Sequence, residues 1–407
     1  MTASLLAAGR LLCRLPADKL AKAIALSHWR TGLYFGETAW LLFALWVLVR
    51  VGNGRTLARM AAKISPKVWV QGLVAAPVWL LILALLELPE SLIGHHVSLE
   101  YRLSVEPWLP WWSDWAKSLV LTLAVGTFVL SVMYAMMRRW PRRWWIGFWA
   151  FTVAAVVVGT FVAPLFVDPL FNHFTPLVQS DPALVQQLER VAERGGLHIP
   201  PSRIFLMDAS RRVTTPNAYV TGIESSKRIV VWDTTIKEES PNEILFTYGH
   251  EQGHYVLHHI PKGLAFAALV FFVFYWIGAH LLLALVRLLG AARGIDSPAD
   301  WGSLGIVLLL MVVLSFIADP IANTFSRNIE HQADVYGQEV IHGLIPDAQA
   351  TVVHSFCSDA QLWLDDPSPN PLVEFWTYSH PSTEERAEFA AHYDPWAPGH
   401  APRYTAK

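Results

Sequence analysis

The sequence of 407 residues is poor in charged side chains. Asp, Glu, Lys and Arg make up 16% of it, whereas 53% of the residues are hydrophobic and the mean hydropathy is +0.34. Soluble domains usually carry about a quarter of charged residues. The formal net charge of −2 leaves no basic surplus, so we expect no nucleic-acid partner. This composition predicts a membrane protein with several spans and a soluble part.

Cysteine is also scarce. The chain contains only Cys13 and Cys357. Two isolated cysteines cannot form a framework of several disulfides or a Cys-rich zinc site. The sequence is therefore neither a disulfide-rich domain nor a zinc-finger-like domain. We expect both residues to be structurally passive.

Long apolar stretches recur along the chain. A helix needs about 20 apolar residues to cross a bilayer, and stretches of about this length lie at residues 33–49, 68–88, 115–137, 144–167, 264–289 and 304–325. Trp side chains gather at several of their ends, as is typical of a bilayer interface. We therefore predict an integral, multi-pass membrane protein, mainly α-helical, with about six transmembrane helices.

The spans divide the chain into a simple order of segments. Arg10 and Arg14 interrupt the first apolar run, which disfavours a signal peptide and favours an amphipathic segment on the membrane surface. The predicted order is an amphipathic N-terminal segment (1–30), transmembrane helices 1–4 (31–167), a catalytic segment (168–262), transmembrane helices 5–6 (263–326) and a C-terminal part of the catalytic domain (327–407).

The polar segment 168–262 has the pattern of a small α+β unit. Residues 181–194 read as an amphipathic helix that ends at two glycines, and 204–207, 217–222 and 229–232 read as short strands. A helix follows them, with a proline near its start and an acid in its first turn.

That helix carries the pattern H-E-x-x-H, formed by His250, Glu251 and His254. On a helix the two histidines stand one turn apart on the same face and can hold one metal ion, with Glu251 placed to take a proton from water. A pattern this short often arises by chance. Without further support, a helix whose two histidines have other partners is the better interpretation.

Glu330 provides the further support. Catalytic zinc usually takes three protein ligands and leaves one position open. A histidine six residues after His254 would indicate the metzincin arrangement, but Ile260 stands there. Glu330 and Asp334 share one helical face past two more spans, so Glu330 can be the third ligand and Asp334 can orient a ligating histidine. Such a pair alone is more often a solvated face, but beside H-E-x-x-H it predicts a zinc site in a zincin-type domain.

Several further motifs occur in a fixed order with these residues: Ala163-Pro164-Leu165-Phe166, Phe174-Thr175-Pro176-Leu177, Asn217-Ala218-Tyr219, Lys227 to Thr234, Gln332-Ala333-Asp334, Tyr378-Ser379-His380-Pro381 and Glu385-Arg386. As a set, from about Trp29 onward, they make the sequence resemble the membrane zinc endopeptidases typified by CAAX prenyl protease 1.

The resemblance implies roles for individual residues. It implies that His250, His254 and Glu330 bind one Zn2+ ion per chain and that Glu251 is the general base. It also implies that His380 stabilises the oxyanion, that Arg386 pairs with Asp334, and that a strand at Asn217, Ala218 and Tyr219 pairs with an extended substrate. Without the resemblance, Asn217 reads as a turn residue, and His380 reads as part of a loop before a helix at Ser382.

The resemblance also sets the expected function, which is zinc-dependent endoproteolysis at the bilayer. The expected substrate is a peptide or protein, and the resemblance suggests C-terminal processing of prenylated CAAX sequences. The alternatives are a quality-control protease without prenyl specificity, a site-2-type intramembrane protease, and an inactive scaffold or transport protein on a protease fold. No particular oligomeric state is indicated. Members of the family have one more span before residues 33–49, where this chain has only 1–30, so its chamber could be more open or completed by another chain.

Two observations conflict over the orientation in the membrane. Most basic residues of the short loops fall on the side opposite the catalytic segment, and the positive-inside rule therefore favours a catalytic side that faces out. The resemblance favours a cytoplasmic catalytic side, which is the orientation we expect from the sequence.

Overall fold

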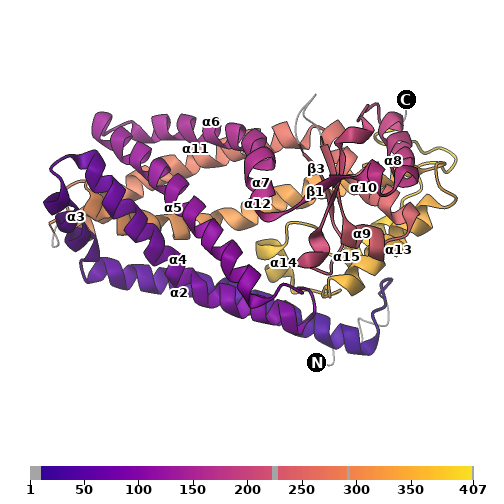
Figure 1. Cartoon of the computed structure of the whole chain (residues 1–407), viewed down its shortest axis with the longest axis horizontal. Helices are drawn as coiled ribbons and strands as arrows, with labels where there is room; N and C mark the ends of the chain where they lie inside the picture. Colours follow the sequence, from indigo (N-terminus) through magenta and orange to yellow (C-terminus); the bar gives the residue numbers. More distant parts are fainter. Residues whose placement is uncertain (1–10, 222–227, 291–293, 406–407) are drawn as a thin grey trace.

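The computed structural model describes residues 11–221, 228–290 and 294–405. The molecule is elongated, with long helices at one end and a sheet surrounded by shorter helices at the other (Figure 1). The described chain begins and ends near the end that carries the sheet (Figure 1).

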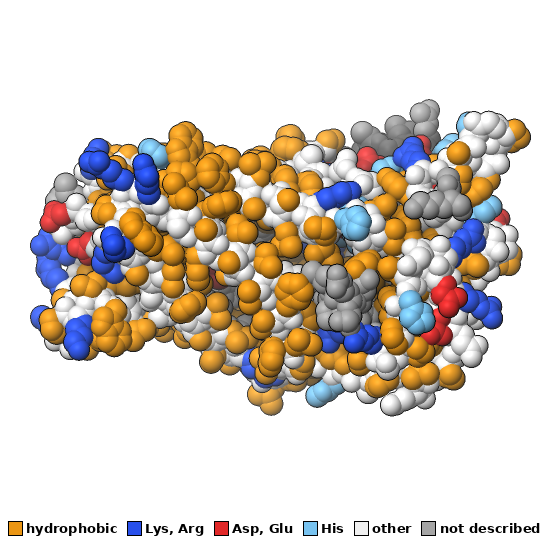
Figure 2. All heavy atoms as spheres, turned by 90° about the horizontal axis from the view of Figure 1, so that it is seen from above, with side chains coloured by type: hydrophobic (Ala, Val, Ile, Leu, Met, Phe, Trp, Pro, Cys, Tyr) orange, Lys and Arg blue, Asp and Glu red, His pale blue; other side chains and the backbone are white. Residues whose placement is uncertain are grey.

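Six helices of the described chain are long and apolar enough to cross a membrane, as the sequence predicted. They are α2 (Ala17–Arg50), α4 (Val68–Glu100), α5 (Trp108–Arg139), α6 (Trp144–Val162) with its continuation through a π-helical turn (Ala163–Val167) into α7 (Asp168–Phe171), α11 (His259–Leu285) with a π-helical turn (Val286–Gly290), and α12 (Leu304–Ile341). Hydrophobic side chains cover much of the surface along these helices (Figure 2), as expected of helices that face lipid.

The end of the helical bundle far from the sheet is closed by an aromatic cluster. The ring of Trp301 stacks on Tyr134 at 4.0 Å, and its indole N–H donates to the carbonyl of Val68 at 3.0 Å. Gly72 lies so close to this indole that a Cβ there would be 2.3 Å from it. The short helix α3 (Asn53–Ile64) connects α2 to α4 at this same end.

The first transmembrane helix starts earlier than predicted. The predicted boundary at residue 30 falls inside α2, which runs without a break from Ala17 to Arg50 after Pro16. Residues 1–10 of the predicted N-terminal segment lie outside the described residues.

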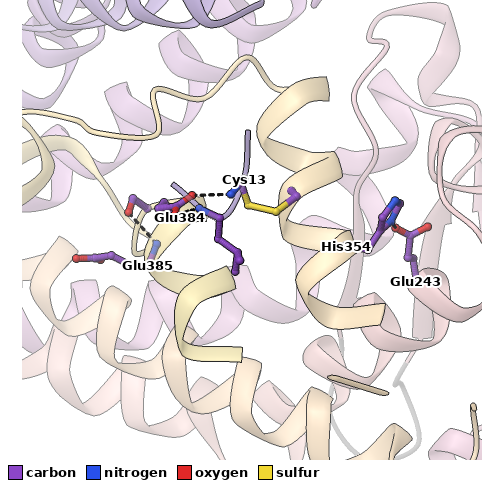
Figure 3. The surroundings of a disulfide bond; sticks show 8 residues. Cys13, Glu243, His354, Glu384 and Glu385 are labelled. Carbon is purple, nitrogen blue, oxygen red and sulfur yellow. Dashed lines mark hydrogen bonds and ion pairs between the residues drawn. A yellow bond between two sulfur atoms is a disulfide. The ribbon is translucent and has the colours of Figure 1, made fainter. Parts of the chain in front are cut away.

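The expectation that both cysteines are passive was wrong. Cys13 and Cys357 form a disulfide across 344 residues of sequence, which joins the segment before α2 to α13 (Ala348–Leu362; Figure 3). Sequence spacing could not reveal this pairing because the chain crosses the whole bundle between the two residues.

The segments 168–262 and 327–407, which the sequence predicted to be catalytic, are called the catalytic unit below. This unit contains a four-stranded sheet in the order β1-β2-β4-β3. The strands are β1 (Phe174–Pro176), β2 (Ile204–Met207), β3 (Ala218–Thr221) and β4 (Arg228–Trp232). β2 and β4 are parallel, and the other two pairs are antiparallel. The strands predicted at 204–207, 217–222 and 229–232 are thus confirmed over the described residues; Gly222 lies outside them.

The unit around this sheet is built from helices that precede the last two spans in the sequence and from helices that follow them. The elements of this unit are α8 (Pro182–Arg194), α9 (Asp233–Glu238), α10 (Pro241–Val256), α14 (Pro371–Thr377), α15 (Thr383–His392) and the short 3₁₀ turns Leu177–Gln179, Pro201–Arg203 and Ala209–Arg211. The α8 bounds confirm the helix predicted at 181–194. Their shared core includes Tyr248, Tyr336 and Phe356, which are buried, so the C-terminal segment belongs to the same unit.

Candidate active site

The helix that carries H-E-x-x-H is fixed at its start by a capping box. The Ser240 backbone N–H donates to the Glu243 carboxylate at 2.7 Å, and the Ser240 hydroxyl accepts from the backbone N–H of Glu243 at 3.4 Å. Pro241 occupies the first turn, where its missing N–H costs nothing. The helix then continues to Val256, so His250 and His254 share one face.

Glycines bring α10 and α12 into close contact. A Cβ on Gly337 would lie 2.9 Å from the backbone nitrogen of His250, and a Cβ on Gly249 would lie 2.8 Å from the Val340 side chain. The two helices therefore approach almost backbone to backbone. This contact places Glu330 of α12 beside the two histidines of α10.

The potential ligand atoms of His250, His254 and Glu330 lie within 4.8 Å of one another. Oε2 of Glu330 is 3.2 Å from Nε2 of His250 and 3.4 Å from Nε2 of His254. This buried oxygen has a third imidazole nitrogen, Nε2 of His380, at 3.2 Å. Two imidazoles and one carboxylate form the donor set of catalytic zinc sites, and ligand atoms that converge on one point fit a shared cation.

Asp334 and Arg386 support the His250 ring from behind. Oδ1 of Asp334 lies 2.9 Å from Nδ1 of His250, and Arg386 donates to the same carboxylate through Nε at 2.9 Å and Nη2 at 2.6 Å. A carboxylate that accepts from Nδ1–H leaves the lone pair of Nε2 directed at the metal position. The structure thus places Asp334 against His250 and pairs Arg386 with Asp334, as the resemblance implied.

Glu251 faces the cavity beside the cluster. Two cavities, of about 490 and about 340 Å3, are both lined by His250, Glu251 and His380. Burial raises the pKa of the Glu251 carboxyl above its usual range, and the two histidines of the motif oppose the shift. A carboxyl of raised basicity at the meeting point of the two cavities is suited to accept a proton.

His380 reaches the cluster from the loop before α15. Its Nε2 lies 3.2 Å from Oε2 of Glu330, and its Nδ1 is 3.0 Å from the Ser379 hydroxyl. About half of the side chain (51%) remains exposed. The sequence also indicated that His380 belongs to a loop before a helix at Ser382. The backbone has this form, because the Ser382 side chain accepts from the backbone N–H of Glu385 and caps α15.

The predicted substrate strand lies at the edge of the sheet. β3 pairs with β4 on one side, and no strand pairs with its other side within the described residues. Ala218 and Tyr219 line the smaller cavity, and Asn217 lines the larger one. Asn217 is anchored by Thr235, whose hydroxyl accepts from its backbone N–H at 2.7 Å and donates to its carbonyl at 2.6 Å.

Several residues that line the site were missed from the sequence. His259 is buried, and its Nδ1 lies 3.1 Å from Nδ1 of His254. The larger cavity is also lined by Ser27, Arg30 and Thr31 of α2 and by the carboxylates of Glu239, Asp359, Asp365 and Asp366. His259 follows the motif closely in the sequence, whereas the other residues approach from distant segments.

Comparison with known proteins agrees with this site. Residues 179–394 match the model of peptidase family M48, a range that includes all three potential metal ligands. The chain belongs to peptidase family M48. It is accordingly a membrane metalloprotease, and the resemblance found in the sequence is confirmed.

Further matches extend over the membrane part of this M48 protease. Residues 11–173 match the model described as CAAX prenyl protease N-terminal, five membrane helices. An uncharacterized metalloprotease, YhfN of Bacillus subtilis, is 32% identical over 92% of this chain and 85% of its own length. CAAX prenyl protease 1 of Saccharomyces cerevisiae is 29% identical over 74% of this chain and 68% of its own length.

A solved structure shows the same fold. The crystal structure of S. mikatae Ste24p superimposes with a TM-score of 0.80 over 93% of this chain and 90% of that chain, at 24% sequence identity. The match supports the arrangement of the spans and the catalytic unit of this M48 protease.

Proposed function

We propose that this protein is a zinc endopeptidase whose metal is held by His250, His254 and Glu330. The observation that carries the proposal is the convergence of their ligand atoms, which all lie within 4.8 Å of one another. When bound, zinc supplies Lewis acidity toward a peptide carbonyl and toward water.

Glu251 is the proposed general base. It takes a proton from the attacking water and passes it to the leaving amine, a role that its position beside His250 in the wall of both cavities supports. His380 is the proposed oxyanion donor. When the Ser379 hydroxyl donates to Nδ1 of His380, the ring proton stays on Nε2, which can then donate to a developing oxyanion.

The free edge of β3 is the proposed binding site for the substrate backbone. An extended peptide that pairs with residues 218–221 would run along the smaller cavity, past Glu251 and His380. Pairing through the backbone fixes the position of the scissile bond without a demand on the substrate sequence. This arrangement suits a protease, and an inactive scaffold would have no use for the assembled base and ligand cluster.

Two substrate classes fit this site. The name of the yeast relative suggests C-terminal processing of prenylated CAAX proteins. A second candidate is cleavage of membrane proteins without prenyl specificity. The acidic side chains in the wall of the larger cavity support it, because a prenyl chain gains nothing from contact with them, although Phe246, Phe356 and Trp363 also line this cavity. Protein prenylation is cytoplasmic, so the first class requires the cytoplasmic orientation that the resemblance implies, whereas the second class is compatible with either orientation.

The test compares two peptides of the same sequence with purified protein in detergent. One peptide carries a farnesylated CAAX terminus, and the other is unprenylated and extended. Cleavage of either peptide by the wild type, with loss of cleavage in Glu251→Gln and retention in the exposed control Glu238→Gln, supports the endopeptidase. Faster cleavage of the farnesylated peptide would favour CAAX processing, and equal rates would favour the second class. Equal turnover by Glu251→Gln and the wild type would rule out the proposed base.

A further inference from the structure

The N-terminal segment is held firmly against the catalytic unit. Besides the disulfide to Cys357, the backbone N–H groups of Leu12 and Cys13 donate to the carboxylate of Glu384 at 2.5 and 3.0 Å (Figure 3). Cys13 is 1% exposed, and the carboxylate comes from the first turn of α15. The bridge is thus part of a specific contact that orients Cys13 toward α13, rather than a chance approach of two surface thiols.

This contact lies beside the active site. The neighbours of Cys357 on α13, Ser355, Phe356 and Asp359, line the larger cavity. So do Ser27, Arg30 and Thr31 of α2, the helix that follows Cys13. The disulfide therefore joins two walls of the catalytic cavity, and its chemical environment is that of the catalytic end.

Disulfides persist in oxidising compartments and are rare in the cytoplasm, where thiols are kept reduced. The two cysteines are the only ones in the sequence, and both are used in this bridge. A bridge at the catalytic end indicates that this end faces the oxidising side of the membrane.

Basic residues at the opposite end of the bundle give an independent indication. The helix ends and short connections there contain Arg50, Arg55, Arg59, Lys63, Lys67, Arg138, Arg139, Arg142, Arg143 and Arg287. Blue side chains gather at this end in Figure 2. Short loops rich in Lys and Arg stay on the cytoplasmic side. The far end is therefore cytoplasmic, which again puts the catalytic end outside.

Basic residues at the catalytic end give weaker evidence for the orientation. The short connection there between α4 and α5 carries Arg102 as its one basic residue. In the N-terminal part of α2, Arg30 pairs with Asp365 at 3.7 Å and Lys19 donates to Gln361 at 3.4 Å. Arg14 and Lys22 lie in the same part of the chain, so this end carries basic residues as well, but fewer in its short connections than the far end.

We propose that the catalytic end of this protein faces the oxidising, non-cytoplasmic side of its membrane and cleaves polypeptides exposed on that side. The orientation stands on the disulfide and the charge distribution, whereas the choice of substrate rests on the proposed peptidase function. Prenylated proteins of the cytoplasm are then not its substrates. Exported chains and the outer segments of membrane proteins are.

The orientation can be tested by labelling thiols in intact cells. The native cysteines are bonded to each other and should not react with a membrane-impermeant maleimide until a reductant is added. Leu372→Cys puts a thiol on α14 at the catalytic end, and Ile64→Cys puts one on α3 at the far end; the two positions are 75% and 65% exposed. We expect labelling at position 372 in intact cells and at position 64 only after lysis.

A pair of C-terminal fusions tests the same point in a bacterial host without any new cysteine. The C-terminus lies at the catalytic end (Figure 1), so alkaline phosphatase fused after Lys407 should be active and green fluorescent protein should be dark. Labelling at position 64 alone in intact cells, free native thiols, or a fluorescent fusion without phosphatase activity would overturn the proposal. None of these readouts needs turnover, so a failure here leaves the peptidase standing, and an inactive enzyme leaves the orientation standing.

Discussion

The contact between α10 and α12 predicts the effect of Gly337→Ala. The added Cβ would lie 2.9 Å from the backbone nitrogen and 3.2 Å from the Cα of His250, and 3.0 Å from the Phe246 ring. Backbone atoms yield little, so α12 must move away from α10 by a few tenths of an ångström. Such overpacking costs about 1–3 kcal/mol, and alanine returns about 1 kcal/mol through its better helix propensity. The free energy of unfolding should therefore fall by only about 0–2 kcal/mol.

The same shift should have a larger effect on the metal site. It moves Glu330 away from His250 and His254, and zinc–ligand distances tolerate only about ±0.2 Å. We expect zinc affinity to fall by about 10–100-fold, the range seen when the supports of a metal ligand are removed. Chelator competition measures the affinity, and peptide cleavage at limiting zinc should fall in parallel.

Gly263→Ala on α11 is the matched control. A Cβ there meets nothing within 4 Å, so this variant gains helix propensity without displacing a neighbour. It should keep the zinc affinity of the wild type. If Gly337→Ala binds zinc and cleaves as well as Gly263→Ala, the close approach of the two helices does not set the metal geometry.

Three other changes have defined outcomes. Arg386→Met leaves the carboxylate of Asp334 without its guanidinium, so the melting temperature should fall by the equivalent of about 3–5 kcal/mol, and a smaller loss in Arg386→Lys would support the ionic explanation. Burial, with Asp359 nearby, raises the pKa of Glu239 from 4.5 to about 8. The protonated form is thus the stable one in the fold, and the wild type should lose stability as the pH rises through about 8. Glu239→Gln should melt higher than the wild type near pH 9 and equally below pH 4.5; a constant difference across this range would contradict the assignment. Cys13→Ser removes a disulfide that stabilises the fold by about 2–5 kcal/mol, so its melting temperature should lie below that of the oxidised wild type. A reductant should lower the melting temperature of the wild type to that of the variant and leave the variant unchanged.

Local patterns predicted much of this molecule. The six spans follow from apolar length alone, and the strands from short runs of β-branched and aromatic residues. The cluster of His250, His254 and Glu330 could also be predicted, because H-E-x-x-H and the pair Glu330 and Asp334 each occupy one helical face, whatever the rest of the chain does. The pairing of His250 with Asp334 then needed only that the two helices meet.

Contacts between distant segments could not be predicted in this way. The disulfide joins residues 344 apart, and nothing in the local sequence of either cysteine indicates its partner. The continuous helix α2 places Ser27 and Arg30 in the wall of the catalytic cavity, although the sequence favoured a separate surface segment there. Hydrophobic periodicity reports which face of a helix is buried, but not which helix buries it.

The most direct test of the central claim is to measure zinc content and peptide cleavage together in the wild type, Glu251→Gln and His254→Ala. The account predicts one zinc ion per chain in the wild type and in Glu251→Gln, with cleavage only in the wild type. It predicts loss of both zinc and cleavage in His254→Ala. Zinc retained at full occupancy in His254→Ala, or normal turnover in Glu251→Gln, would contradict it.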